Sequence, residues 1–417
     1  MTPGGAGRGR RWAPTLAALG ILAALGFACA RHPARPRSPE IAFWEPWPPA
    51  ALAPLVARFE AENPGLRVRI RQVPLEAVDD SVSAALAAGL PPDLCALGPA
   101  GMPRWLASGS LSDWSAGVAD LRDSLRGWPM CTVGDALYGL PWLLRTRALV
   151  FDPGLFRRAG LDPARPPATW GELRADAARI QKLGHGVHGV GLACGDSLES
   201  ALGFLSFAWG NGGEVLSAGL DSCRFDSPEV LEALEFYLSL RRSALLAPAD
   251  SLAREFAAGR LGMLVGDGAR LAARPAPAGP AGVALVPAPA EDRGSHAAFA
   301  DGVVLVSFTS SRRKEAALRL ARALVRSDRA PALAASLGGP QPANVGADSS
   351  AALAAVPVVL VLTRQCATAR FAPAVARWDS MRTAIAHELA EAMGDRKSAA
   401  DALSDAAARI AALVGHP

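Results

Sequence analysis

The sequence lacks the motifs of common catalytic and nucleotide-binding sites. It has no Gly-x-Ser-x-Gly nucleophile elbow, no Walker lysine loop and no His-Glu-x-x-His zinc motif. The segment 184–189 spells Gly-x-Gly-x-x-Gly, but it follows a predicted helix, whereas a dinucleotide site needs a strand there. His185 and His188 have no third metal ligand in local reach. We therefore expect no catalytic residue, no metal and no cofactor, and the chain is not expected to be an enzyme.

The sequence also lacks a strong excess of charge of one sign. Its 43 Lys and Arg residues against 39 Asp and Glu give a net charge of only +4. No basic domain and no alternation of aromatic and basic residues is present, which excludes nucleic acid as a partner. With 417 residues, half of them hydrophobic, the chain is too long for one simple core. Two lobes are predicted.

Cysteine is scarce, and no pair of cysteines has Cys-x-x-Cys spacing. Beyond Cys29 the chain has an odd number of cysteines, namely Cys95, Cys131, Cys194, Cys223 and Cys366. At most two disulfides are possible among them, and the sequence does not assign the pairing. The interpretation we favour is that they are small buried hydrophobic residues.

Residues 1–29 have the features of a signal peptide. Basic residues precede an apolar run, 12–28, which ends in small residues at Cys29. The segment Leu25 to Cys29 resembles a bacterial lipobox, in which Cys29 becomes the lipidated first residue. Ordinary signal-peptidase cleavage around Cys29 is the alternative and would discard it. The lipoprotein is favoured because residues 30–39 form a polar, proline-rich tether of the kind that follows an anchor.

The residues after the tether predict an α/β fold. Residues 41–44 read as a buried strand, and the apolar residues from Leu52 to Phe59 recur at helical spacing. From Leu66 to Ile70 apolar residues alternate with arginines, a pattern typical of a strand with one wet face. This strand–helix–strand order begins a lobe with a largely parallel sheet.

The run from Tyr138 to Leu173 predicts a chain crossing between two lobes. Residues 148–151 form a short apolar strand, and Asp152 starts a helical turn. Thr169, with Glu172 three residues later, makes a capping box that opens a second helix.

This run, YGLPWLLRTRALVFDPGLFRRAGLDPARPPATWGEL, resembles the signature of extracytoplasmic solute-binding proteins of the sugar-binding family, which are similar to maltose-binding protein. Further segments resemble that family in the same order. They include FEAENPGLRVRI, ALAAGLPPDLCAL, FAWGNGGEVL, EFAAGRLGMLVGDG and RWDSMRTAI. The likeness extends from Glu40 to Leu413.

The resemblance implies a type II periplasmic-binding-protein fold, with two discontinuous α/β lobes joined by hinge strands. A second crossing strand is expected where the segment FADGVVLVSF begins. We place lobe one at residues 38–145 plus 303–346, and lobe two at residues 146–302 plus 347–417.

Tryptophan is the residue that points to a ligand. Sugar rings have apolar C–H faces and a rim of hydroxyls, so aromatic platforms with planar polar groups suit them. Several of the ten tryptophans lie near predicted strand ends, where α/β clefts hold ligands. The resemblance implies that Trp378 stacks on the sugar and that Arg382 makes a polar contact; interlobe packing is the alternative for Trp378. The candidate ligand-binding residues are Trp44, Glu45, Trp47, Trp142, Arg145, Trp209, Asp267, Trp378 and Arg382.

By resemblance, the chain is the substrate-binding lipoprotein of an ABC importer. It would bind a sugar or oligosaccharide between the lobes and deliver it to the permease subunits. It would act in the periplasm or at the cell surface, anchored to the membrane by lipidated Cys29. Two alternatives stay open. Arg145 stands where the maltose receptor has an acid, which favours an anionic or glycerol-phosphate-like solute. A binding-only sensor subunit would have the same fold.

Overall fold

The structure is a computed structural model that describes residues 40–98, 101–195, 198–273, 279–372, 375 and 377–414. The predicted leader with Cys29 and the tether lie outside these residues.

The described chain is built on a mixed sheet of eleven strands, eight of which follow the order β2-β1-β3-β11-β6-β9-β7-β8. The strands of this path are β1 (Glu40–Glu45), β2 (Arg67–Gln72), β3 (Leu94–Leu97), β6 (Leu140–Phe151), β7 (His188–Ala193), β8 (Ala244–Ala247), β9 (Leu261–Asp267) and β11 (Ala298–Val306). The strands β10 (Gly282–Ala284) and β12 (Gln341–Pro342) pair with β6, and β13 (Ala369–Phe371) pairs with β11.

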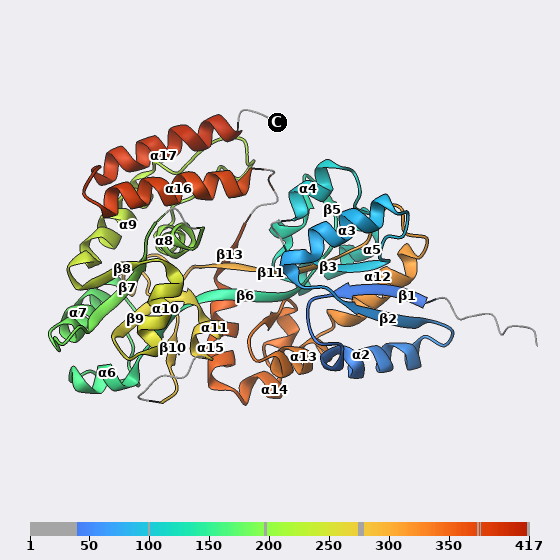
Figure 1. The fold of residues 1–417 in the computed structure, drawn as a ribbon, viewed down its shortest axis with the longest axis horizontal. Coiled ribbons are helices and arrows are strands. Elements are labelled where there is room, and N and C mark those ends of the chain that lie inside the picture. Colours follow the sequence, from blue (N-terminus) through green and yellow to red (C-terminus); the bar gives the residue numbers. More distant parts are fainter. Residues whose placement is uncertain are drawn as a thin grey trace, which may run out of the picture.

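Two antiparallel strands, β6 and β11, run through the middle of the molecule and belong to both of its halves (Figure 1). Up to Thr146, β6 pairs with β11; from Arg147 onward it pairs with β9. The predicted strand 148–151 is therefore only the end of a twelve-residue strand. At Gly302 the two strands approach closely, because a Cβ atom there would lie 2.2 Å from the carbonyl oxygen of Leu143.

The first lobe is the half that contains β1, β2 and β3. Its helices are α2 (Pro49–Glu62), α3 (Val78–Ala87), α4 (Met102–Ala107), α5 (Ser115–Val118), α12 (Lys314–Leu324), α13 (Ala330–Leu337) and α14 (Ala351–Ala354). The predicted helical spacing is confirmed, since Leu52, Leu55, Val56 and Phe59 are the buried residues of α2. Apolar clusters cover both faces of the sheet, with Leu143 in one cluster and Leu144 in the other.

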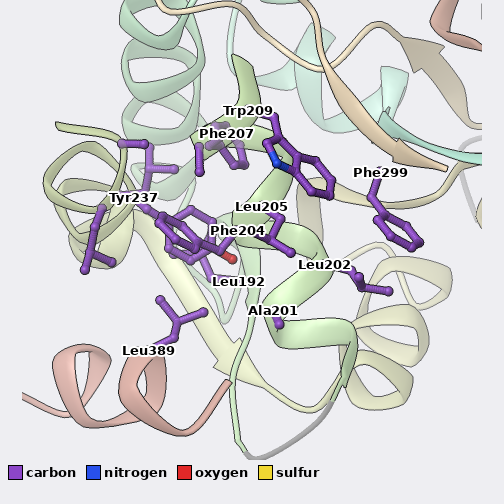
Figure 2. Packing of buried hydrophobic residues seen from close by; sticks show 14 of the residues in the cluster. Leu192, Ala201, Leu202, Phe204, Leu205, Phe207, Trp209, Tyr237, Phe299 and Leu389 are labelled. Atoms are coloured by element: carbon purple, nitrogen blue, oxygen red, sulfur yellow. The ribbon is translucent and has the colours of Figure 1, made fainter. Parts of the chain in front are cut away.

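The second lobe is the half that contains β7, β8 and β9. Its helices are α6 (Pro153–Arg158), α7 (Trp170–Gln181), α8 (Leu198–Gly210), α9 (Pro228–Ser239), α10 (Ala249–Ala257), α11 (Gly268–Ala272), α15 (Pro357–Ala367), α16 (Trp378–Met393) and α17 (Ala399–Val414). Figure 2 shows the core of this lobe, in which aromatic residues of α8 pack against Tyr237 of α9 and Leu389 of α16. The predicted capping box is confirmed at Thr169 and Glu172, where α7 begins.

The architecture confirms the predicted α/β class. The chain limits of the two lobes stay a prediction, and one segment packs against both. Leu353 of α14 and Val359 of α15 lie in the segment 347–417 that was predicted to belong to lobe two, but both join the apolar cluster of the first lobe. The helix α15 also contacts β6, β10 and α11. The segment from α14 to α15 therefore contacts both lobes and lies below β6 and β11 in the view of Figure 1.

Candidate functional site

A groove of about 460 Å³ lies between the two lobes, where β6 and β11 cross. Its volume is within the usual range for a small-molecule site. The first lobe contributes Leu75, Glu76, Val78, Asp79, Gly98, Gly101, Pro103 and Met130. The crossing strands contribute Arg145, Phe299, Asp301 and Gly302, and the second lobe contributes Ala372, Trp378 and Arg382. We call this space the central groove.

Trp378 and Arg382 form one edge of the central groove. Trp378 is the first residue of α16, and Arg382 follows one turn later on the same face. Trp378 is largely buried, keeps 6% of its surface exposed and belongs to the apolar core cluster of the second lobe as well as lining the groove. The Arg382 guanidinium donates a hydrogen bond to Asp379. The structure thus brings two of the predicted site residues together at the interlobe surface.

The floor of the groove is a cluster of charges on β6 and β11. Asp301 forms ion pairs with both arginines of β6: its Oδ2 accepts a hydrogen bond from Arg147 Nη1 at 3.3 Å, and its Oδ1 lies 3.4 Å from Arg145 Nε. Arg147 also donates to Glu199 at 2.8 Å, and its guanidinium lies over the ring of Phe299 at 4.8 Å. The cluster holds the crossing strands together at the point where the lobes meet.

Arg147 stays charged although it is buried. Burial alone would lower the pKa of its guanidinium, but the carboxylates of Asp301 and Glu199 outweigh that effect and raise the pKa above its ordinary value. Arg145 differs, because it is the one exposed residue of β6. Of the two arginines, only Arg145 therefore has donors open to a bound molecule.

A second hollow of about 490 Å³ adjoins the central groove, and Trp378 lines both. Trp209, at the end of α8, lines this hollow and stacks on Phe299 with ring centroids 6.0 Å apart (Figure 2). Because Phe299 lines the central groove, the two hollows share a wall of aromatic rings. We call the second space the Trp209 hollow.

A third hollow, of about 480 Å³, lies on the other side of Arg145 and Asp301. It faces the carboxyl ends of β7 and β9, where α/β folds commonly hold ligands. Asp267, a predicted site residue, lines it. One oxygen of Asp267 already accepts from the backbone N–H of Arg270 at 3.1 Å, so it caps α11 as well.

Four predicted site residues lie away from these three hollows, near the end of β1. The prediction that Trp142 binds the ligand is wrong. Trp142 is completely buried and packs against Phe43 and Trp47. The reason is that β6 is covered on both faces, which encloses every one of its side chains except Arg145. Trp44 is also buried, under the guanidinium of Arg71.

Glu45 is the fourth of these residues and has an unusual environment. Its side chain is buried, and burial raises the pKa of its carboxyl to about 7, although the backbone N–H of Trp47 donates to it and lowers the pKa in part. Its Oε1 has no hydrogen-bond partner among the described residues. Glu45 therefore faces the packed protein and not the central groove.

Sequence reasoning missed several groove residues. Asp301 and Phe299 lie within the segment recognised as a crossing strand, but the resemblance assigns neither of them a role in binding. Asp79 lines the first-lobe wall and accepts from Trp105 Nε1 at 2.7 Å. Charged residues inside an otherwise apolar strand, such as Asp301, were the available signal.

In the described part of the chain, the five cysteines after Cys29 are all free thiols. No group of three or more His, Cys, Asp or Glu residues is arranged to hold a metal among the residues described. No helix in the same residues is long and apolar enough to cross a membrane.

The two lobes, the crossing strands and the groove between them define the class of type II periplasmic binding proteins. The chain belongs to the family of bacterial extracellular solute-binding proteins, whose model matches residues 45–328. The family is one of solute binding, and its solved members include a solute-binding protein of an ABC transporter and the sugar-binding protein MalE of Xanthomonas citri.

Individual relatives support the assignment. A protein of Brucella abortus described as a binding protein is 31% identical over 290 residues, which is 65% of this chain and 67% of that one. The structure of an ABC transporter solute-binding protein from Thermotoga lettingae, bound with α-D-tagatose, is 25% identical with a TM-score of 0.71; the match covers 91% of this chain and all of that one. The cyclic α-maltosyl-1,6-maltose binding protein of Arthrobacter globiformis shares the fold, with a TM-score of 0.81 at 24% identity over 91% and 99% of the two chains.

Proposed function

We propose that the protein captures an uncharged carbohydrate in the central groove and delivers it to the membrane subunits of an ABC importer. The observation that carries this proposal is the position of Trp378, with Arg382 one turn later, at the edge of a groove between two lobes. An indole face stacks on the C–H face of a sugar ring, while a guanidinium can donate to two neighbouring hydroxyls. The tagatose-bound relative supports the same ligand class.

The charges of the groove favour a neutral ligand over an anion. Its lining holds three carboxylates, Glu76, Asp79 and Asp301, but only two guanidinium groups, Arg145 and Arg382. Both guanidinium groups already have a carboxylate partner, Asp301 for Arg145 and Asp379 for Arg382. A phosphate would have to displace these partners while lying near further negative charge. The hydroxyl groups of a sugar can accept hydrogen bonds from the same guanidinium groups without displacing their carboxylate partners. They can also donate hydrogen bonds to the carboxylates.

The proposed working cycle is hinge closure about β6 and β11. The groove has walls from both lobes, so a ligand that contacts both stabilises the closed arrangement over the open one. The division into lobes at residues 38–145 plus 303–346 and 146–302 plus 347–417 remains part of this proposal. No covalent chemistry is proposed.

The proposed location is the outer face of the cytoplasmic membrane, with the chain anchored through lipidated Cys29. The support is the leader sequence together with membership of an extracellular family. The tether 30–39 would let the lobes reach the permease while the anchor keeps them at the membrane surface.

A ligand screen tests the proposal. Monosaccharides, oligosaccharides, glycerol phosphates and oligopeptides are compared by thermal shift, since a ligand at 100-fold its dissociation constant adds about 2.7 kcal/mol of stability. We expect a saccharide to raise the melting temperature and Trp378→Ala to abolish that shift. Trp378→Phe, which keeps a ring, should retain part of it. Circular dichroism of each variant without ligand controls for folding.

Two outcomes would contradict the proposal. If only glycerol phosphates stabilise the protein, the solute is anionic. If a saccharide shift persists undiminished in folded Trp378→Ala, the groove edge is not the binding site.

A further inference from the structure

The second lobe carries a further hollow, of about 910 Å³, beside the edge strand β8. Its walls are α7, the end of α9, the 3₁₀ helix η4 (Leu240–Ser243), the strand β8 and Asp395, which follows α16. None of its lining residues lines the central groove, the Trp209 hollow or the third hollow. It is a separate place on the molecule, and we call it the β8 hollow.

The strand β8 has a free edge. It is the last strand in the order of the sheet and pairs only with β7 among the described residues. The backbone N–H of Cys194, just after β7, donates to the carbonyl oxygen of Ala247 at 3.2 Å, so Ala247 faces β7. Because successive residues of a strand direct their backbone groups to opposite sides, Ala244 and Leu246 direct theirs away from β7. Both of these residues line the β8 hollow.

The outward backbone groups of β8 can pair with a further strand. The N–H of Ala244 already donates to the carbonyl oxygen of Arg241. The N–H of Leu246 and the carbonyl oxygens of Ala244 and Leu246 are the groups that an added strand would use. Recognition of this kind, in which an extended peptide joins the edge of a sheet, obtains its affinity from main-chain hydrogen bonds.

The two edges of the sheet differ in their side chains. At the opposite edge, β2 carries Arg67, Arg69 and Arg71, and charged side chains on an edge strand oppose pairing with another chain. The strand β8 has the sequence Ala-Leu-Leu-Ala, is half-buried throughout and has no charged side chain. Of the two edges, β8 is therefore the one that accepts a further strand.

The charges around the β8 hollow favour an acidic partner. Three guanidinium groups line it, those of Arg174, Arg241 and Arg242, against the single carboxylate of Asp395. Asp395 is paired with Arg241. Arg174 and Arg242 are both exposed and have no ion-pair partner among the described residues. A guanidinium can bind a carboxylate through two parallel hydrogen bonds, so these two arginines can each hold an acidic side chain.

We propose that the β8 hollow binds an extended, acidic peptide segment of a partner protein, which adds to β8 as a further strand. Side chains at every second position of such a segment lie on one face, so alternating acids can all face the arginines. Because β8 has only four residues, strand pairing alone would bind weakly, and the ion pairs add specificity and fix the register.

Other occupants fit the β8 hollow less well. A second copy of this chain, paired edge to edge, would bring two sets of arginines together, and like charges on facing strands are destabilising. A lipid headgroup or a free phosphate would satisfy the arginines, but it would leave the outward backbone groups of β8 unpaired. The combination of a free edge and unpaired guanidinium groups is specific to an acidic peptide.

Titration of the full mature chain with capped synthetic peptides of about eight residues tests the proposal. The first peptide alternates valine and glutamate, and the second alternates valine and lysine. The third is the valine–glutamate peptide with a central proline, which removes a hydrogen-bond donor from the strand. We expect the first peptide to bind about tenfold more tightly than either of the others. Inorganic phosphate and vesicles of phosphatidylglycerol are titrated in parallel as competing anions.

Variants of the protein test the arginines and the edge separately. The double variant Arg174→Glu, Arg242→Glu should weaken binding of the valine–glutamate peptide about tenfold or more. Its control is Arg158→Glu, at an exposed position of α6 outside the hollow, which should have little effect. Leu246→Pro removes an outward N–H, which an edge strand tolerates, and should weaken binding more than Leu246→Ala, which shortens the side chain alone. Circular dichroism of each variant controls for folding.

Several outcomes overturn the proposal. They are equal binding of the valine–glutamate peptide and its proline form, binding of phosphate or vesicles without binding of any peptide, and an equal loss in Arg158→Glu and the double variant. Equal affinity in folded Leu246→Pro and Leu246→Ala would also overturn it. If Leu246→Pro does not fold, the proline peptide tests the same hydrogen bonding on wild-type protein. None of these results bears on sugar binding in the central groove.

Discussion

Asp301 of β11 lies directly opposite Arg145 of β6, and the same carboxylate reaches Arg147 two residues further along β6. Because side chains two residues apart in a strand share a face, one acid can pair with both arginines. The arrangement lies where β6 leaves β11 and begins to pair with β9. The ion pairs of Asp301 therefore connect the two strands at the point where the backbone passes from one lobe to the other.

Removing that shared carboxylate should be costly. Asp301→Asn leaves buried Arg147 with Glu199 as its main counter-charge, and we expect a loss of about 2 kcal/mol or more in the free energy of unfolding. Urea denaturation measures it. Glu255→Gln, which breaks an exposed pair with Arg260, is the control and should cost much less. Equal losses in the two variants would mean that the Asp301 cluster contributes no more than a surface pair.

Glu45 should make stability depend on pH. Burial raises the pKa of its carboxyl in the folded state to about 7, above the ordinary value of 4.5. Between these values the folded state holds the proton and the unfolded state does not, so wild-type protein loses stability as the pH rises through this interval. Glu45→Gln carries no such proton and should become more stable than wild type by roughly 1–3 kcal/mol above pH 7. Urea denaturation at pH 5, 6, 7 and 8 would show it. Parallel curves for the two proteins would refute it.

Trp142 and Trp378 should respond differently to the same conservative change. Trp142→Phe opens space in a fully enclosed core and should cost about 1–3 kcal/mol of stability while leaving ligand affinity within about twofold. Trp378→Phe removes part of a groove platform and should weaken binding with less effect on folding. Denaturation and titration with the best saccharide of the screen separate the two effects. Weakened binding in a fully stable Trp142→Phe protein would return Trp142 to the binding site.

Cys29 should decide where the mature chain resides. In a bacterial host, wild-type protein is expected in the detergent-extractable membrane fraction with the added mass of a lipid. Cys29→Ser should be found in the soluble extracytoplasmic fraction without that mass. Fractionation with mass spectrometry of the mature N-terminus is the measurement. A wild-type chain that begins after Cys29 would show that ordinary signal-peptidase cleavage takes place.

Local sequence patterns predicted the regular elements that they encode directly. The capping box at Thr169 and Glu172, the helical spacing of α2 and the α/β class are all confirmed, because each depends on neighbours in the chain. The full length of β6 was not predicted. Pro141, near its start, and Arg145 within it interrupt the pattern of a strand, and only the pairing of Leu140 with Leu305 of β11 shows that it begins there.

The groove was predictable only in part. Trp378 and Arg382 could be placed because family resemblance fixes them and a helix fixes their spacing. The position of Trp142 could not be predicted. Whether a tryptophan in such a strand faces a groove or a core depends on which helices cover the strand. Asp301 stands out in the sequence only as a charge within an apolar strand. Its partners are visible only in the structure, where β6 and β11 bring it against two arginines that lie more than 150 residues earlier in the chain.

The ladder between β6 and β11 shifts register between Val303 and Val304, one residue beyond Gly302 of the groove. An interrupted ladder opens to solvent more readily than a regular one. The rate of amide hydrogen exchange at Val303 and Val304 should therefore report whether the central groove holds a ligand. Exchange at these amides would slow when a bound ligand holds the lobes together, and would become faster when the ligand leaves.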